Sequence, residues 1–165
     1  MKALFITLEE LKRKSIIDGN VDTDKLIQFV EVAQDTYIQT QLGTVLYDKL
    51  QTDIKNSTLS GNYSTLVNTY LKPMLIWFSQ SEYMKYAAFQ ISNGGVFKHI
   101  SENAESVSKN EIDYLVEKER DIAEYYTRRF IDYMTYNQTS FPEYTSNSNE
   151  DIDPDKDALF NGWVL

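Results

Sequence analysis

Hydrophobic residues recur at steps of three and four through most of the first 137 residues, and this spacing predicts α-helices. The first helix is expected to begin at Leu8 and to end near Ser15. Thr7 followed three residues later by Glu10 is the pattern of a capping box, in which each side chain accepts a hydrogen bond from the other residue's backbone N–H. The chain therefore opens with a short, capped helix.

The second and third predicted helices meet at Gly43. The second begins at Asp22 or Thr23, because either side chain can cap the free N–H groups of a helix start. Its apolar positions at helical spacing are Leu26, Val30, Ala33 and Tyr37. Thr44 is expected to cap the third helix, VLYDKLQTDIKN, whose apolar face carries Leu46, Leu50 and Ile54.

A central helix is predicted from Ser64 to about Ser92. Pro73 either kinks this segment or lies in the first turn of a new helix, because proline has no backbone N–H to donate. Apolar side chains cover most of its surface: Met74, Ile76, Trp77, Phe78, Tyr83, Met84, Tyr86, Ala88, Phe89 and Ile91. Little of this helix can face water, and the glycines of Asn93-Gly94-Gly95 are expected to end it.

The longest predicted helix runs from Ser108 to about Tyr136. Ser108 and Glu111 form a second capping-box pattern at its start. Its apolar stripe is Ile112, Leu115, Val116, Ile122, Ala123, Tyr126, Phe130 and Met134. Glu119 interrupts the stripe, which indicates a partly wet face or a contact with another subunit rather than a catalytic acid.

Helical periodicity ends after Asn137. Ser, Asn, Asp and Pro dominate residues 138–157, and strand-like alternation is weak throughout the chain. We therefore predict an all-α fold, a small helical bundle of about five helices with an extended C-terminal arm. The helical domain is expected to span residues 1–137, and the arm residues 138–165.

Composition narrows the class of protein. A chain of 165 residues is long enough for one domain with a single core. No apolar run approaches the roughly 20 residues of a membrane span, so no membrane contact is expected. Cysteine is absent, which excludes disulfides and thiol chemistry. The net charge of −9 repels phosphate backbones and disfavours tight binding around nucleic acid.

No catalytic, cofactor or metal site is predicted, so we expect a protein that is not an enzyme. His99 is the only histidine, and the serine near it lacks the glycine context of a nucleophile elbow. The aspartates of DGNVDTD (18–24) and DIDPDKD (151–157) alternate as calcium ligands do, but neither run has the required glycine or closing glutamate. The sequence contains no glycine-rich phosphate-binding motif.

The predicted arm has apolar residues at both ends and a polar middle. These apolar residues are Phe141, Pro142, Tyr144, Leu159, Phe160, Trp163, Val164 and Leu165. They either fold back onto the chain's own core or bind another molecule. Because aromatic anchors joined by a polar linker are typical of an extended docking segment, we predict that they bind a partner.

Residues 5–43, FITLEELKRKSIIDGNVDTDKLIQFVEVAQDTYIQTQLG, resemble the N-terminal signature of the head–tail adaptor, or connector, proteins of tailed bacteriophages. The shared features are a short ITLEE-like helix, an acidic turn, and a helix that begins with acidic residues and Leu-Ile. The resemblance continues in LGTVLYDKL, in the order of the helices and in the FPEY ending. The long linker at 93–107 and the long acidic tail depart from the compact members of that family.

The resemblance implies a structural virion protein. In that family a small helical bundle forms a dodecameric ring beneath the portal protein, extends the DNA channel, and docks on other neck proteins through a C-terminal segment. We therefore expect a homo-oligomeric ring at the head–tail interface of the virion, made in the host cytoplasm, through which DNA passes during ejection without specific binding. The alternative is a monomeric helical protein-binding or regulatory module without catalytic activity.

Overall fold

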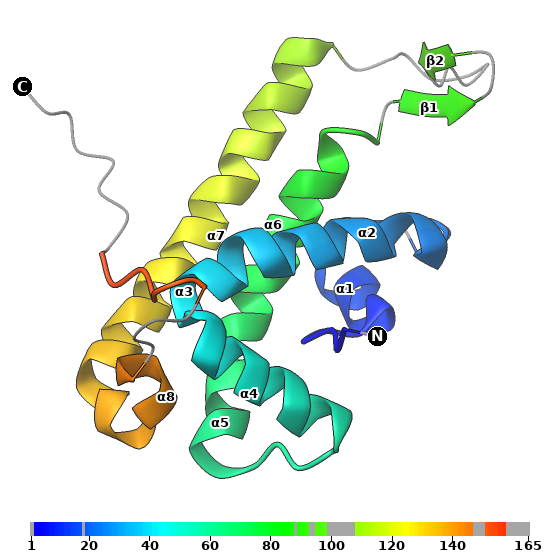
Figure 1. Cartoon of the computed structure of the whole chain (residues 1–165). Helices are drawn as coiled ribbons and strands as arrows, with labels where there is room; N and C mark the ends of the chain where they lie inside the picture. Colours follow the sequence, from blue (N-terminus) through cyan, green and yellow to red (C-terminus); the bar gives the residue numbers. More distant parts are fainter. Residues whose placement is uncertain are drawn as a thin grey trace, which may run out of the picture.

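Helices form nearly all of the regular structure, so the predicted all-α bundle is confirmed (Figure 1). The computed structural model describes residues 2–17, 19–87, 89–92, 95–98, 108–146 and 151–157. Within these ranges, no helix combines the length and the apolar content that crossing a membrane requires.

The N-terminal half contains α1 (Leu8–Lys14), α2 (Thr23–Ala33), α3 (Thr40–Leu42) and α4 (Thr44–Lys55). A π-helical turn, η1 (Gln34–Gln39), joins α2 to α3 without a break, so both belong to the predicted second helix. Thr7 Oγ1 accepts the backbone N–H of Glu10 at 3.0 Å. The Glu10 carboxylate binds Lys14 and Lys72, so only half of the predicted capping box forms. The helix start is still capped as predicted.

The central segment comprises α5 (Gly61–Thr65), a second π-helical turn η2 (Leu66–Leu71), and α6 (Lys72–Met84). Pro73 is the second residue of α6, directly after the wide π turn, and the helical segment continues through it. Because proline cannot donate a backbone N–H, the change from π-helical to α-helical hydrogen bonding at this point accommodates it within the helical segment. The segment is therefore continuous, and α6 occupies the centre of the bundle with α2 and α7 packed against it (Figure 1).

The predicted end of the central helix is wrong: α6 ends at Met84, not near Ser92. Strand β1 (Phe89–Ser92) pairs with β2 (Gly95–Lys98) in an antiparallel hairpin, with Ser92 opposite Gly95. The connecting dipeptide in the sequence is Asn93-Gly94, a strong signal for a two-residue hairpin turn. The same residues had indicated a helix stop, since both structures favour glycine.

Helix α7 (Lys109–Asn137) lies beside α6 along much of its length, and both project past the rest of the bundle (Figure 1). The capping box at its start is complete, as predicted: Ser108 Oγ accepts the N–H of Glu111, and the Glu111 carboxylate accepts the N–H of Ser108. Hydrogen bonds from the side chain and the backbone of Ser108 lower the pKa of Glu111 because they favour its charged form.

The prediction of an extended arm from residue 138 is wrong for its first part. A 3₁₀ turn, η3 (Gln138–Ser140), and a one-turn helix, α8 (Pro142–Thr145), continue directly from α7. Helix α8 packs against α4, so these residues belong to the bundle. Among the described residues of the predicted arm, 138–146 are helical except for Phe141 and Ser146, whereas 151–157 contain no helix.

Residues 151–157 form a clasp over the corner between α3 and α4. The N–H of Thr44 donates to the Ile152 carbonyl at 2.9 Å, and the N–H of Asp155 donates to the Thr40 carbonyl at 2.9 Å. Gly43 lies beneath Pro154 at φ 73° and ψ 159°, a conformation that is essentially restricted to glycine. A Cβ at Gly43 would meet the Pro154 ring at 2.6 Å. The clasp therefore requires glycine for two reasons, backbone conformation and space.

Gly43→Ala is predicted to lower the free energy of unfolding by about 3 kcal/mol or more, since it adds a steric clash to backbone strain. Gly61→Ala is the matched control, because Gly61 also has a positive φ but open space around it. Strain alone there should cost about 1 kcal/mol. Denaturant unfolding measures both values. Hydrogen exchange should show faster exchange at the Thr44 and Asp155 amides in Gly43→Ala only; equal protection in the two variants would contradict this account of the clasp.

Candidate functional site

Two of the predicted partner-binding residues, Phe141 and Tyr144, are buried in this chain's own core. The Phe141 ring lies edge-on to Tyr63, with ring centroids 5.3 Å apart. Lys156 Nζ lies 5.1 Å from the centre of the Tyr144 ring. Burial, with a smaller contribution from Asp155, raises the pKa of Tyr144 to about 12. The partner-binding prediction is therefore wrong for these two aromatic residues, because packing against α7 and α4 already covers them.

The other predicted partner-binding residues have different outcomes. Pro142 begins α8 and is exposed. Leu159, Phe160, Trp163, Val164 and Leu165 lie outside the described residues, as does His99. Their binding to a partner stays a prediction.

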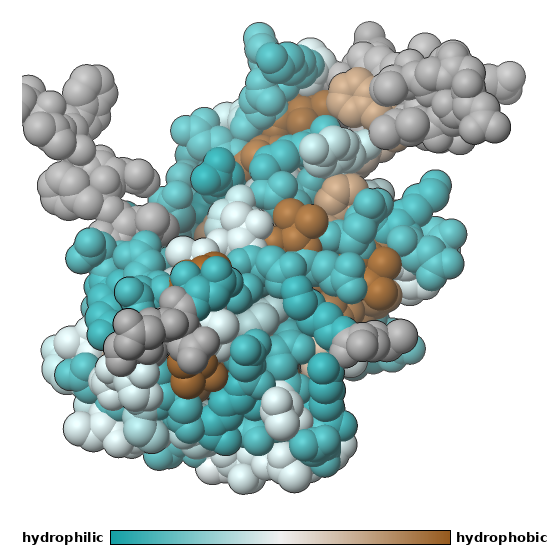
Figure 2. Space-filling view, viewed as in Figure 1, coloured by the Kyte–Doolittle hydropathy of each residue, from teal (hydrophilic) through white to brown (hydrophobic). Residues whose placement is uncertain are grey.

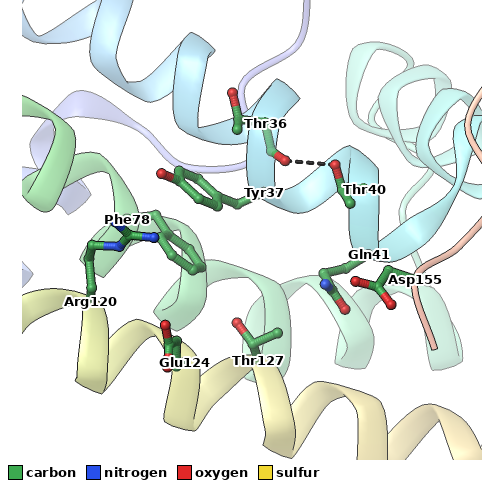
Figure 3. A pocket seen from close by; sticks show the side chains of 9 residues that line it. All are labelled: Thr36, Tyr37, Thr40, Gln41, Phe78, Arg120, Glu124, Thr127 and Asp155. Carbon is green, nitrogen blue, oxygen red and sulfur yellow. Dashed lines mark hydrogen bonds between the residues drawn. The ribbon is translucent and has the colours of Figure 1, made fainter. Parts of the chain in front are cut away.

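A partly open cavity of about 150 Å³ lies between the η1–α3 segment, α6, α7 and the clasp (Figure 3). The η1–α3 segment contributes Thr36, Tyr37, Thr40 and Gln41. The other lining residues are Phe78, Arg120, Glu124, Thr127 and Asp155. A segment that is remote in sequence thus completes one wall of the cavity through Asp155.

An aromatic pair forms another wall of the cavity. The Tyr37 and Phe78 rings are stacked, with centroids 3.8 Å apart and planes 4° apart. The Tyr37 hydroxyl donates to Glu82 Oε1 at 2.7 Å. Burial and this hydrogen bond raise the pKa of Tyr37 to about 12, so the phenol stays protonated at neutral pH. The stacking on Phe78 and the hydrogen bond to Glu82 together fix the position of the Tyr37 ring.

Gln41 presents an unsatisfied polar atom at this cavity. Its side chain is only 6% exposed, and Oε1 is buried without a hydrogen-bond partner among the described residues. The Gln41 amide points into the space between α3 and α7, on the side of Asp155 (Figure 3). A buried acceptor without a partner costs about 1–3 kcal/mol, so the site favours a group that brings a hydrogen-bond donor.

Exposed aromatic and aliphatic side chains follow the outer face of α7. Tyr114, Tyr125 and Tyr136 are 58%, 62% and 87% exposed. They are spaced eleven residues apart, about three helical turns, so they form one row along the helix. Leu115 and Ile122 flank this tyrosine row and are also exposed. Figure 2 shows hydrophobic side chains gathered over the projecting part of α6 and α7. Phe89 of β1 is also exposed.

Glu119 lies on the buried face of α7 and is only 4% exposed. Its Oε1 accepts a hydrogen bond from Gln80 Nε2 at 2.8 Å, while Oε2 is buried with no partner among the described residues. Gln80 Oε1 in turn accepts the N–H of Ile16 at 2.8 Å. Burial raises the pKa of Glu119 because the charged form loses its hydration. Glu119 is therefore a buried polar link between α7 and α6, and the prediction of a partly wet face at this position is wrong.

In the described ranges, no group of three or more His, Asp or Glu residues is placed to hold a metal ion. The cavity offers an aromatic wall and an orphan acceptor, and the tyrosine row offers an exposed contact surface.

Sequence reasoning missed both the tyrosine row and the cavity. The eleven-residue spacing of Tyr114, Tyr125 and Tyr136 is visible in the sequence and could have identified the row. The cavity joins Thr40 to Asp155 across more than a hundred residues, and no local pattern signals such a contact.

Comparison with known proteins gives a match to a protein family. Residues 38–154, more than half of the chain, match the model of a family of unknown function (DUF6712). The matched range extends from η1 to Pro154 of the clasp, so it includes both Gly43 and the proline that covers it. No curated protein and no solved structure matches the chain.

Glu119→Gln is predicted to stabilise the protein increasingly as pH rises. A raised pKa means that the folded state holds its proton when the unfolded state has lost it, so wild-type stability falls as pH rises above 4.5, the ordinary pKa of a glutamate side chain. Glutamine keeps the hydrogen bond with Gln80 and does not titrate. The gain in Tm should therefore be larger at pH 8 than at pH 5.

Glu117→Gln is the control for this measurement, since Glu117 is exposed on the same helix. Thermal unfolding across this pH range should show little pH-dependent change for the control. An unchanged or lower Tm for Glu119→Gln at pH 8 would contradict the conclusion that Glu119 is a buried carboxyl group whose charge destabilises the fold.

Proposed function

We propose that this chain, which belongs to the DUF6712 family, is a ring-forming structural subunit of a bacteriophage head–tail adaptor. The tyrosine row on α7 is the observation that carries the proposal. It leaves an aromatic surface exposed on the longest helix, and such surfaces mark protein–protein contacts. The resemblance of residues 5–43 to head–tail adaptors supplies the class of assembly.

The composition of the outer face of α7 suits a subunit interface. Tyrosine and arginine are enriched at interface centres because they bury a large apolar area and keep a polar tip. The row combines Tyr114 and Tyr125 with the aliphatic side chains of Leu115 and Ile122. Lys118 Nζ lies 5.6 Å from the centre of the Tyr114 ring and forms an ion pair with Asp121, so these two charged groups beside the row pair with each other.

A ring requires each subunit to present two different surfaces, one to each neighbour. The tyrosine row is proposed as one of them, with a different surface of the adjacent copy opposite it. The resemblance implies twelve copies beneath a portal protein, with other neck or tail proteins on the far side. The assembled ring would form part of the virion neck.

The charge of the chain supports a channel through which DNA moves without being held. A net charge of −9 per subunit multiplies around a ring and repels the phosphate backbone. Contacts between Lys or Arg side chains and the phosphates would then be too few to hold the DNA during ejection. Acidic side chains are therefore expected to face the lumen of the ring.

Tyr125→Asp is predicted to prevent ring formation while leaving the subunit folded. Burying a new charge at an interface centre should weaken each contact by about 2 kcal/mol or more, roughly 30-fold. Val32→Asp is the matched control, because it places the same charge at a half-exposed apolar residue on α2. Sedimentation and electron microscopy, with and without the portal protein, measure assembly, and circular dichroism checks the fold.

The expected result is a ring for wild type and Val32→Asp and a monomer for Tyr125→Asp. A wild-type chain that stays monomeric at high concentration and on the portal would contradict the ring and favour the monomeric binding module. If Tyr125→Asp still forms a ring, the tyrosine row is not part of the subunit interface.

A further inference from the structure

One end of the cavity beside α3 is rich in hydrogen-bond acceptors. The Thr40 hydroxyl, which lines it, donates its proton to the Thr36 carbonyl at 2.7 Å. The Thr127 hydroxyl, on the α7 side, donates its proton to the Ala123 carbonyl at 2.9 Å. A hydroxyl has one proton to donate, so both oxygens keep lone pairs for a donor that enters the cavity.

Gln41 and Asp155 add further acceptors at the same end. Gln41 is 6% exposed, and its Oε1 has no partner in the described part of the chain. The last torsion of a glutamine side chain is broad, so a turn of the amide brings Oε1 toward the cavity at little cost. The backbone bond from Asp155 to Thr40 places the Asp155 carboxylate next to Gln41. This carboxylate accepts the N–H of Asp157 at 3.1 Å and has lone pairs for more bonds.

The charges along the cavity favour a cation at this end. Figure 3 shows Arg120 toward the Tyr37 end of the cavity, and Asp155 at the opposite end with Gln41. Among the lining residues, the carboxylates of Glu124 and Asp155 outnumber the guanidinium of Arg120, so the lining is net negative. A divalent metal ion prefers several carboxylate oxygens, whereas the Gln41 end has one carboxylate among neutral oxygens. An organic cation with N–H donors suits it better.

The rest of the cavity is suited to an apolar stem. The stacked Tyr37 and Phe78 rings form one wall, and the volume of about 150 Å³ has room for several water-sized groups. An alkyl chain can pack against this wall while the ammonium group at its end donates up to three hydrogen bonds. A primary alkylammonium therefore matches both the apolar wall and the acceptor-rich end.

We propose that this cavity binds the primary ammonium group of an alkylamine, supplied either by a free amine or by a lysine side chain of a second copy of this chain. The ammonium lies between Gln41 and Asp155 and donates hydrogen bonds to Gln41 Oε1 and the Asp155 carboxylate. The alkyl stem passes along Phe78 toward the opening. The proposal does not depend on the ring, because every residue that it uses belongs to one subunit.

A titration of the full-length chain with n-butylammonium chloride at constant ionic strength tests the site. The resonances of the Gln41 side-chain amide, followed by NMR, should shift in a saturable way with a Kd in about the millimolar range. n-Butanol has a similar size but no charge, and tetramethylammonium has the charge but no N–H. Both should bind at least about tenfold more weakly, because charge and donor are both required.

Three variants locate the ammonium. Gln41→Leu and Asp155→Asn should each weaken n-butylammonium binding by about tenfold or more, and Gln41→Glu should strengthen it several-fold because it adds a negative charge at the acceptor. Asp151→Asn is the matched control, since it removes the same charge from an exposed residue of the clasp that does not line the cavity. Shifts of backbone amides and circular dichroism check that each variant is folded.

Repeating the titration at higher protein concentration identifies the source of the ammonium. A lysine of a second copy would compete with n-butylammonium, so the apparent Kd would rise with protein concentration. A Kd that does not change with protein concentration would identify a free amine as the ligand.

Three results would overturn the proposal. The first is the absence of saturable n-butylammonium binding, which would mean that water satisfies the acceptors. The second is equal binding of n-butanol, which would assign the cavity to neutral ligands. The third is an equal loss of affinity in Asp151→Asn and Asp155→Asn, which would attribute binding to the general negative charge of the surface.

Discussion

The burial of α6 is the constraint on which the rest of the bundle depends. Met74 and Leu75 are fully buried, and so are the polar residues Ser79 and Gln80 on the same helix. Buried amides must be paired, so Gln80 holds the backbone of Ile16 on one side and Glu119 of α7 on the other. These polar contacts select one register among the many that apolar packing alone would allow. Helix α7 and the segment after α1 are thereby positioned against one helix.

Most of the helical framework could be predicted from the sequence because it is encoded locally. Ser108 and Glu111 lie three residues apart, and their capping box depends on little else. The apolar periodicity also located α6 at the centre of the bundle. The end of α6 could not be predicted, because the apolar run from Tyr86 to Ile91 fits a helix and a strand equally well. The Asn-Gly sequence that favours a hairpin there also suits a helix stop.

The functional surfaces depend on contacts that local patterns do not encode. Phe141 and Tyr144 follow the last long helix as isolated aromatic residues, so periodicity could not distinguish core packing from partner binding. Glu119 was recognisable as a break in a stripe, but only the position of Gln80 shows that the break is buried. The cavity depends on a contact between Thr40 and Asp155, which are far apart in the sequence. The tyrosine row is different, since its eleven-residue period was readable in advance.

The clasp also fixes an order of events during synthesis. Ile152 and Thr44 are 108 positions apart in the sequence, yet each forms a hydrogen bond with the other. Ribosomes make the chain from its N-terminus, so the α3–α4 corner emerges long before the residues that cover it. Until Pro154 arrives, the backbone at Gly43 is open to water, chaperones and proteases. Gly43 can therefore be covered only in a chain whose synthesis has passed residues 151–157.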